Sequence, residues 1–182
     1  MTSMTAIPAH EIKLLFSATK VEARVKMLAD QIAQEYNGQQ VTLVGVLNGA
    51  FMLVADLSRA LEARGVAVKI AFITATSYEG TESGDLTIAF DKKVDLRGEK
   101  VLVVDDILDT GKTLDHLKHE LQKHNPASLE VVVLLHKACK TTFRVAADYI
   151  GFVIGDLFVV GFGLDYCGLY RGKDALYVIV FY

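Results

Sequence analysis

A short polar run that follows Val101–Val104 holds the side chains of this sequence that are best suited to chemistry. Its members are Asp105, Asp106, Asp109, Thr110, Gly111, Lys112 and Thr113. A glycine lets the backbone approach a ligand closely, threonines offer hydroxyl groups, and the free N–H groups at a helix start attract an anion. The end of the run, Thr110–Thr113, therefore suits a phosphate monoester.

The acidic start of the run suits another part of a ligand. Asp105 and Asp106 would repel a phosphate group placed beside them. Carboxylates do accept hydrogen bonds from neutral hydroxyl groups, such as those of a vicinal sugar diol. Because the acidic and the threonine-rich parts belong to one short loop, the pattern predicts that this loop binds a sugar phosphate.

Three other interpretations of the run are open at this point. Residues 111–113, Gly-Lys-Thr, resemble the end of a nucleoside triphosphate P-loop, but that motif requires a glycine where Asp106 stands. Residues 109–111, Asp-Thr-Gly, resemble an aspartic protease triplet, but that fold is all-β and needs two such loops, whereas a helical pattern follows here. Aspartates that only cap a helix are the third alternative, which is less common for three aspartates beside two threonines.

Alternating strands and helices must position this loop. Apolar runs predict strands, and apolar residues at helical spacing predict helices, the first of which starts with a capping-box pattern at Thr19 and Glu22. The expected strands cover 41–47, 66–75, 86–90, 101–105 and 129–135, and the expected helices cover 19–37, 51–65 and 113–125. This alternation is typical of an α/β fold: an open, mostly parallel twisted sheet flanked by helices, which binds ligands beyond the carboxyl ends of its strands.

Two further segments lack helical spacing. Ser77–Asp85 is polar and rich in glycine and acid, which predicts a mobile loop. Beyond Lys137, short strands are expected around 149–154, 158–161 and 176–181 with no helical pattern between them, and they predict a small β-rich cap over the site. Because no internal repeat or linker divides residues 1–182, we expect a single domain.

Composition limits the function classes. The chain has 182 residues, 52% of them hydrophobic, and a mean hydropathy of +0.32, which indicates buried strands or a hydrophobic subunit interface. No apolar run approaches the roughly 20 residues that span a membrane, and no secretory signal pattern is present, so we expect a cytoplasmic protein. A net charge of −3 provides no basic field for nucleic acid. Cys139 and Cys167 match no zinc spacing and are interpreted as packing residues.

The segment Val101–Leu114, VLVVDDILDTGKTL, resembles the phosphoribosyl diphosphate signature of the type I phosphoribosyltransferases. Asp109, at the variable position of that signature, resembles the 6-oxopurine branch, the hypoxanthine-guanine phosphoribosyltransferases. Further matches follow in order from about Val41: the loop and helix VLNGAFMLVADL, the flexible loop with Ser77 and Tyr78, the base-reading Lys137, and the purine pocket FVVGFGLDY at 158–166 with Arg171. The resemblance thus covers nearly the whole chain beyond that point.

The resemblance implies a reaction and its participants. A ring nitrogen of hypoxanthine, guanine or xanthine displaces pyrophosphate from phosphoribosyl diphosphate, with magnesium bridging the diphosphate, and a nucleoside monophosphate forms. Asp109 would accept the proton near the purine N7. Asp105 and Asp106 would hold the ribose hydroxyl groups, and Thr110, Gly111, Lys112 and Thr113 would bind the 5′-phosphate.

The resemblance also implies roles for residues far from this loop. Lys137 would donate a hydrogen bond to the 6-oxo group, Phe158 would stack on the purine, and Val159 would contribute only its backbone. Asp165 would bind a second magnesium ion, and its main chain would face the 2-position of the purine. The pyrophosphate would be bound by Asn48, Gly49 and Arg171. Ser77 and Tyr78 would belong to a lid that excludes water. Without the resemblance, Lys137 would be interpreted as a solvated lysine and Phe158 as a core residue.

Two positions depart from the family pattern. Asn48 stands where relatives often carry Lys or Arg beside the pyrophosphate, so a positive charge is missing there. Asp105 stands where many relatives carry Glu, and its shorter side chain makes Asp106 the stronger candidate for the ribose. Because of the charge missing at Asn48, we expect a lower affinity for the diphosphate.

Two other functions are open. A regulatory protein of the same fold can use this loop to sense phosphoribosyl diphosphate, but it would not require Asp109, Lys137 and Asp165, and the chain has no dense basic patch for nucleic acid. A phosphoribosyltransferase for another base is the second alternative, and Lys137 argues against it. The family and the apolar excess together suggest a homodimer or homotetramer.

Overall fold

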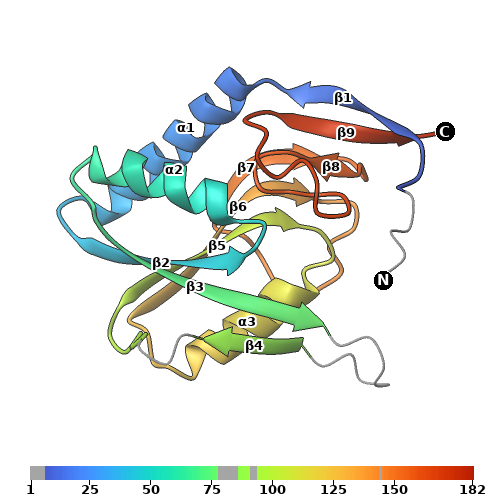
Figure 1. Cartoon of the computed structure of the whole chain (residues 1–182). Coiled ribbons are helices and arrows are strands. Elements are labelled where there is room, and N and C mark those ends of the chain that lie inside the picture. The colour runs from blue at the N-terminus through green and yellow to red at the C-terminus, as the bar shows by residue number, and fades with distance from the viewer. Residues whose placement is uncertain (1–6, 78–85, 91–93, 144) are drawn as a thin grey trace, which may run out of the picture.

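The computed structural model describes residues 7–77, 86–90, 94–143 and 145–182, which form two β-sheets and the helices around them (Figure 1). The larger sheet has the order β4-β3-β2-β5-β6-β7, and its neighbouring strands are parallel except for β3 and β4. These strands are β2 (Gln40–Leu47), β3 (Ala67–Ser77), β4 (Leu86–Phe90), β5 (Lys100–Leu108), β6 (Ser128–Lys137) and β7 (Tyr149–Ile154). The predicted open, mostly parallel sheet is confirmed.

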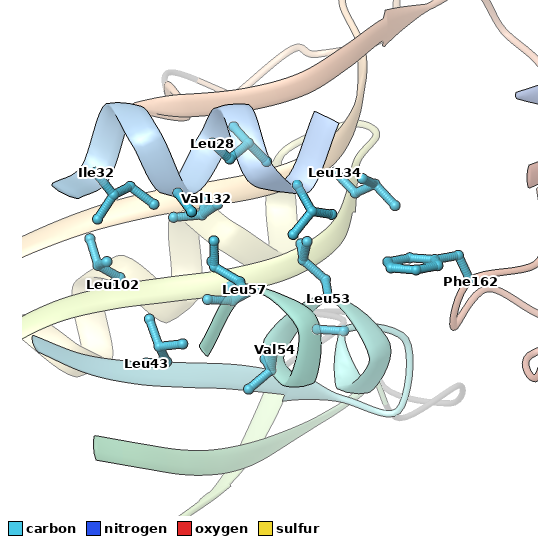
Figure 2. Packing of buried hydrophobic residues seen from close by; sticks show 14 of the residues in the cluster. Leu28, Ile32, Leu43, Leu53, Val54, Leu57, Leu102, Val132, Leu134 and Phe162 are labelled. Atoms are coloured by element: carbon cyan, nitrogen blue, oxygen red, sulfur yellow. The ribbon is translucent and has the colours of Figure 1, made fainter. Parts of the chain in front are cut away.

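Helices cover both faces of this sheet: α1 (Ala18–Tyr36) and α2 (Phe51–Glu62) on one face, and α3 (Lys112–Gln122) on the other. Because side chains alternate along a strand, Leu102 and Val104 of β5 pack with α1 and α2, whereas Val101 and Val103 pack with α3. Figure 2 shows the first of these cores, in which Leu53 of α2 points toward the sheet. The helices therefore hold β5 in place from both faces of the sheet, immediately before the polar loop begins.

The smaller sheet joins the two ends of the described chain. Its strands are β1 (His10–Phe16), β8 (Val159–Val160) and β9 (Leu176–Phe181), in the antiparallel order β1-β9-β8. Figure 1 shows β1 and β9 side by side above the end of the larger sheet. A β-rich cap was predicted, but β1 was not, and β7, which was expected in the cap, pairs in parallel with β6 in the larger sheet.

Some local expectations were wrong. Ser17 rather than Thr19 is the N-cap of α1, because the Ser17 hydroxyl accepts a hydrogen bond from the Lys20 amide at 3.3 Å. Cys139 and Cys167 are exposed, since both lie in turns, and they are not packing residues. Within the described ranges, no helix combines the length and the apolar character that a membrane span requires.

Candidate active site

The carboxyl ends of β2 and β5 border a cleft of about 280 Å³. Apart from apolar side chains, the cleft is lined by Gly49, Asp105, Asp106, Asp109, Thr110, Gly111 and Thr113. β5 does not end at Asp105 as expected but continues to Leu108, and Asp105 lies opposite Val133 of β6. The sheet therefore holds the backbone of the acidic pair, and the predicted loop lies where ligands collect in such sheets.

Asp105 and Asp106 form a buried acidic pair at the base of the cleft. Asp105 accepts a hydrogen bond from the Asp106 amide at 2.9 Å. Burial, followed by the negative charge of Asp106, raises the pKa of Asp105 well above its ordinary value. Burial also raises the pKa of Asp106, although the Arg171 guanidinium acts in the opposite direction. Because burial disfavours the negative charge of both carboxyl groups, the pair suits a ligand that donates hydrogen bonds from hydroxyl groups or brings a positive charge.

The turn between β5 and α3 has the shape of an anion-binding site. Gly111 has a φ of +90°, and a Cβ there would lie 2.8 Å from Cγ1 of Val145, so the position requires glycine. Gly111 is also the N-cap of α3, so no N-cap side chain competes for the amides of the first turn. The Lys112 amide donates to Oγ1 of Thr110 at 3.3 Å. The Lys112 side chain is exposed and does not line the cleft.

Lys137, the last residue of β6, reaches the same loop from the neighbouring strand. Its buried ammonium lies 3.1 Å from Oδ2 of Asp109 and 3.6 Å from Oδ1 of Asp156. The other carboxylate oxygen of Asp109 is buried and has no hydrogen-bond partner among the described residues. Thr141 donates to the Asp109 carbonyl at 2.9 Å and holds the loop in place. Lys137 is therefore not a solvated lysine but half of a donor and acceptor pair.

Gly49 lies where three segments meet. A Cβ on Gly49 would lie 1.7 Å from Oδ2 of Asp106, so the acidic pair packs directly against the turn after β2. A Cβ on Gly163 would lie 1.9 Å from the Gly49 carbonyl oxygen, and Gly163 has a φ of +101°. The peptide bond between Leu47 and Asn48 is cis, and the Asn48 side chain is exposed outside the cleft lining.

Residues 161–173, which we call the hood, connect β8 to the segment before β9 and pack on this turn. Nη1 of Arg171 donates to the Gly163 carbonyl at 2.7 Å, and Nη2 lies 2.6 Å from Oδ1 of Asp165. The Gly168 amide donates to the other oxygen of Asp165 at 2.8 Å. Arg171 and Asp165 are therefore paired with each other within the hood.

Phe158 is 47% exposed, so it is not the core residue that its apolar neighbours suggest. Val159, the next residue, is buried in β8. Edge contacts hold the Phe158 ring against Tyr166 and Phe181, with ring centroids 5.6 and 6.2 Å apart. An exposed aromatic ring with a fixed edge is available to stack on a flat ligand.

Two of the predicted residues belong to the expected lid. Ser77 is the last residue of β3, which extends two residues beyond the expected Ala75. Tyr78 and the rest of the expected mobile loop lie outside the described residues.

Two residues that contact the site were not predicted. Asp156 lies beside Lys137, and His10 contacts Tyr166 of the predicted purine-pocket segment. Neither residue belongs to a recognisable sequence motif, so no local pattern indicated its place.

A larger hollow of about 610 Å³ lies between α1 and α2 and reaches Phe162 of the hood. Four of its charged side chains form two ion pairs, Lys26 with Glu22 and Arg59 with Asp56, and Arg64 pairs with Asp30 outside the lining. It contains no residue of the polar loop. The smaller cleft is therefore the candidate active site.

Comparison with known proteins agrees with this geometry. The chain matches the phosphoribosyl transferase domain over residues 12–167. It is 37% identical to hypoxanthine phosphoribosyltransferase of Escherichia coli over 166 residues, 89% of this chain and 92% of the relative. It is 35% identical to hypoxanthine-guanine phosphoribosyltransferase of Aquifex aeolicus over 177 residues, 97% of this chain and 99% of the relative.

Solved structures give the same result. The crystal structure of a hypoxanthine-guanine phosphoribosyltransferase from Bacillus anthracis superposes on this chain with a TM-score of 0.86 and 35% sequence identity. The match covers 94% of this chain and 100% of that chain. A hypoxanthine phosphoribosyl transferase of Trypanosoma cruzi has a TM-score of 0.88 and 37% identity, with 96% of this chain and 95% of that one covered. The chain belongs to the phosphoribosyl transferase family.

Proposed function

We propose that this protein is a purine salvage enzyme that transfers the 5-phosphoribosyl group from phosphoribosyl diphosphate to hypoxanthine, guanine or both. The products are inosine or guanosine monophosphate and pyrophosphate. The observation that carries the proposal is the contact of Lys137 with Asp109 at 3.1 Å, beside a turn that is built to bind an anion. A base-reading donor and a proton acceptor thus lie next to the phosphoribosyl site.

The Lys137 and Asp109 pair matches one edge of a 6-oxopurine, on which O6 and N7 are neighbours. An ammonium group only donates hydrogen bonds, so Lys137 binds O6 and disfavours the 6-amino group of adenine. The carboxylate oxygen of Asp109 that has no partner among the described residues takes the proton from N7 as the bond between the base and the ribose forms. The exposed ring of Phe158 stacks on the base, and the backbone of Val159 and the main chain of Asp165 face its other edge.

The phosphoribosyl group occupies the cleft itself. Thr110–Thr113 binds the 5′-phosphate with threonine hydroxyls and the amides at the start of α3. Lys112 contributes its amide there, since its exposed side chain does not line the cleft. Asp105 and Asp106 accept hydrogen bonds from the ribose hydroxyl groups. Their negative charge stabilises the positive charge that develops on the sugar during the reaction.

The diphosphate binds between the turn after β2 and the hood. The Asn48 and Gly49 turn supplies backbone groups, and the Arg171 guanidinium exchanges its contact with Asp165 for the more highly charged phosphates. We retain Ser77, the last residue of β3, and Tyr78, outside the described residues, as candidates for a lid that would exclude water from the diphosphate.

We propose magnesium as the metal, and the donor set of the site fits it. Mg²⁺ prefers oxygen ligands and is usually held by one or two carboxylates together with substrate phosphates. Asp105, Asp106 and Asp165 supply such carboxylates, and the described residues contain no preformed group of three or more metal-binding side chains. When bound, the ion neutralises charge on the leaving pyrophosphate.

The proposal is tested by incubating the protein with phosphoribosyl diphosphate and magnesium together with hypoxanthine, guanine, xanthine or adenine, each separately. We expect monophosphate products, separated by chromatography, from at least one 6-oxopurine and not from adenine. Product from adenine alone would favour another phosphoribosyltransferase. Binding of phosphoribosyl diphosphate without product from any base would favour the sensing protein instead.

We also propose that the enzyme is a homodimer or homotetramer. Phe51 of α2 and Ile70 and Phe72 of the neighbouring β3 are 39%, 48% and 39% exposed. A Cβ on Gly45 would lie 2.9 Å from the Phe72 ring and 2.7 Å from Val54 of α2, so Phe72 flanks this helix. Exposed apolar side chains of this kind favour a protein contact. Light scattering after gel filtration measures the oligomeric state, and a monomer would contradict this proposal.

The single domain and the cytoplasmic location stay predictions.

A further inference from the structure

His10, the first residue of β1, connects the N-terminal strand to the hood. Its Nδ1 lies 2.7 Å from the Pro8 carbonyl oxygen, and its Nε2 lies 2.8 Å from the Tyr170 hydroxyl. A carbonyl oxygen only accepts, so Nδ1 carries a proton. In the neutral imidazole, Nε2 then has a free lone pair and accepts the hydrogen bond that the Tyr170 hydroxyl donates.

Tyr170 needs such a contact because of its backbone. Its φ is +77°, in the left-handed region that is costly for a bulky side chain and persists only where the surrounding structure holds it. Besides the hydrogen bond, the His10 ring contacts the Tyr170 ring edge-on, with centroids 5.8 Å apart. The next residue in the chain is Arg171, so the conformation of Tyr170 sets the direction from which that guanidinium leaves the backbone.

The same imidazole also reaches the purine side of the site. The His10 and Tyr166 rings meet edge-on with centroids 5.2 Å apart, and Tyr166 in turn contacts the edge of Phe158 at 5.6 Å. His10 is paired across the strands with Phe181 of β9, which contacts both rings. His10 therefore contacts Tyr170, the residue before Arg171 in the hood. Through Tyr166 and Phe181 it also supports the ring of Phe158, which is proposed to stack on the base.

We propose that His10 is a positioning residue: its hydrogen bond holds Tyr170, and through Tyr170 it holds Arg171 in place for the diphosphate. This inference rests on the proposed function, because it takes Arg171 to be a ligand of the diphosphate. It assigns a role in the active site to β1, although none of its residues lines the cleft. The loss of the hydrogen bond weakens diphosphate binding, while the chemistry at Asp109 continues.

The test is a double-mutant cycle with His10→Phe, Tyr170→Phe and the double variant. Each single change removes one partner of the bond and keeps an aromatic ring. We expect each to raise the KM for phosphoribosyl diphosphate and the Kd for magnesium pyrophosphate about three- to tenfold, the range of one hydrogen bond, with a much smaller change in kcat. The double variant should show no more than the effect of one single change. His10→Gln, which retains an acceptor, should restore part of the affinity.

Tyr182→Phe is the matched control. The Tyr182 hydroxyl donates to Oε2 of Glu11 at 2.5 Å, so this change also removes a hydroxyl contact between the C-terminus and β1, but away from the hood. We expect its KM and Kd to equal those of the unchanged protein. An equal effect of Tyr182→Phe would mean that only the pairing of β1 with β9 matters, and would overturn the inference, as would unchanged binding in His10→Phe or additive effects in the double variant.

Hydrogen exchange separates this inference from the proposed function. The Phe162 and Gly163 amides donate to the carbonyls of Lys173 and Arg171 at 2.8 and 2.9 Å, so their exchange reports on the hood without any substrate. Faster exchange in His10→Phe than in Tyr182→Phe supports the positioning role, and equal exchange overturns it. Absence of turnover with every base in the unchanged protein would overturn the proposed function, whatever the exchange rates are.

Discussion

The ammonium of Lys137 lies 3.1 Å from Oδ2 of Asp109, although Lys137 ends β6 and Asp109 follows β5. β5 and β6 are parallel neighbours, so their carboxyl ends place the loop residue beside the last residue of β6. The second carboxylate oxygen of Asp109 is buried without a partner among the described residues. In the proposed reaction, O6 of the purine would replace Oδ2 of Asp109 as the acceptor of the Lys137 ammonium, and the carboxylate would take up the proton of the base.

Asp109→Asn should lower kcat about 10²- to 10⁴-fold, because an amide cannot take up the proton that a general base removes. The Kd for phosphoribosyl diphosphate should change little, since the phosphate-binding turn is intact. Steady-state kinetics and calorimetry measure the two quantities, with Asp115→Asn on α3, outside the cleft lining, as the control. An unchanged kcat would refute the role of Asp109.

Asp105→Asn should stabilise the free protein at neutral and higher pH. Burial raises the pKa of Asp105 in the folded chain, whereas the unfolded chain keeps the ordinary value of about 3.9. Between these two pKa values the unfolded chain has released a proton that the folded chain still holds, so the free energy of unfolding falls as the pH rises. The amide is never charged and escapes this loss, and its oxygen still accepts from the Asp106 amide.

The gain should therefore be near zero at pH 3 to 3.5 and grow as the pH rises toward 8, and each kcal/mol of gain raises Tm by about 2–4 °C. Thermal unfolding at both ends of this pH range measures it. A gain of equal size at both ends would show that the charge of Asp105 is not its source. The Kd for phosphoribosyl diphosphate should rise in the same variant, because Asp105 is a proposed ligand of the ribose.

Gly163→Ala should lower the stability by about 1–3 kcal/mol, because the new Cβ would lie 1.9 Å from the Gly49 carbonyl oxygen at a φ of +101°. The displaced turn should also weaken diphosphate binding. Gly172→Ala is the matched control in the same hood, since a Cβ there meets no atom within 4 Å. Thermal unfolding and pyrophosphate titration test both variants, and equal effects in the two would contradict the contact.

Asn48→Lys should tighten binding of phosphoribosyl diphosphate, because it restores a positive charge beside the proposed diphosphate site. Asn48 is exposed, and an exposed ion pair contributes about 0.2–1 kcal/mol, or up to about fivefold in Kd. Titrations at low and high salt measure the effect, with Asn48→Gln as the uncharged control. The gain should shrink at high salt. Equal affinity of the Lys and Gln variants at low salt would place the diphosphate elsewhere.

The turn between β5 and α3 could be predicted from the sequence because its residues are consecutive, and phosphate binding by this turn stays a prediction. The left-handed φ of Gly111 and the start of α3 are local consequences of residues 105–113. The central strands could be predicted for a related reason. β2, β5 and β6 are buried on both faces, so their apolar runs are nearly unbroken and distinct from the amphipathic helices.

Only the tertiary structure decided which distant segments meet. The sequence HEIKLLF of β1 shows no clear alternation, and its partner β9 lies at the other end of the chain. The contacts of Lys137 with Asp109, of His10 with Tyr170 and of Gly163 with Gly49 join segments that are far apart in sequence. Strand order, register and the packing of the hood determine these neighbours, and no local pattern encodes them. The sequence alone thus determined the chemistry of the loop, and the fold decided which side chains face it.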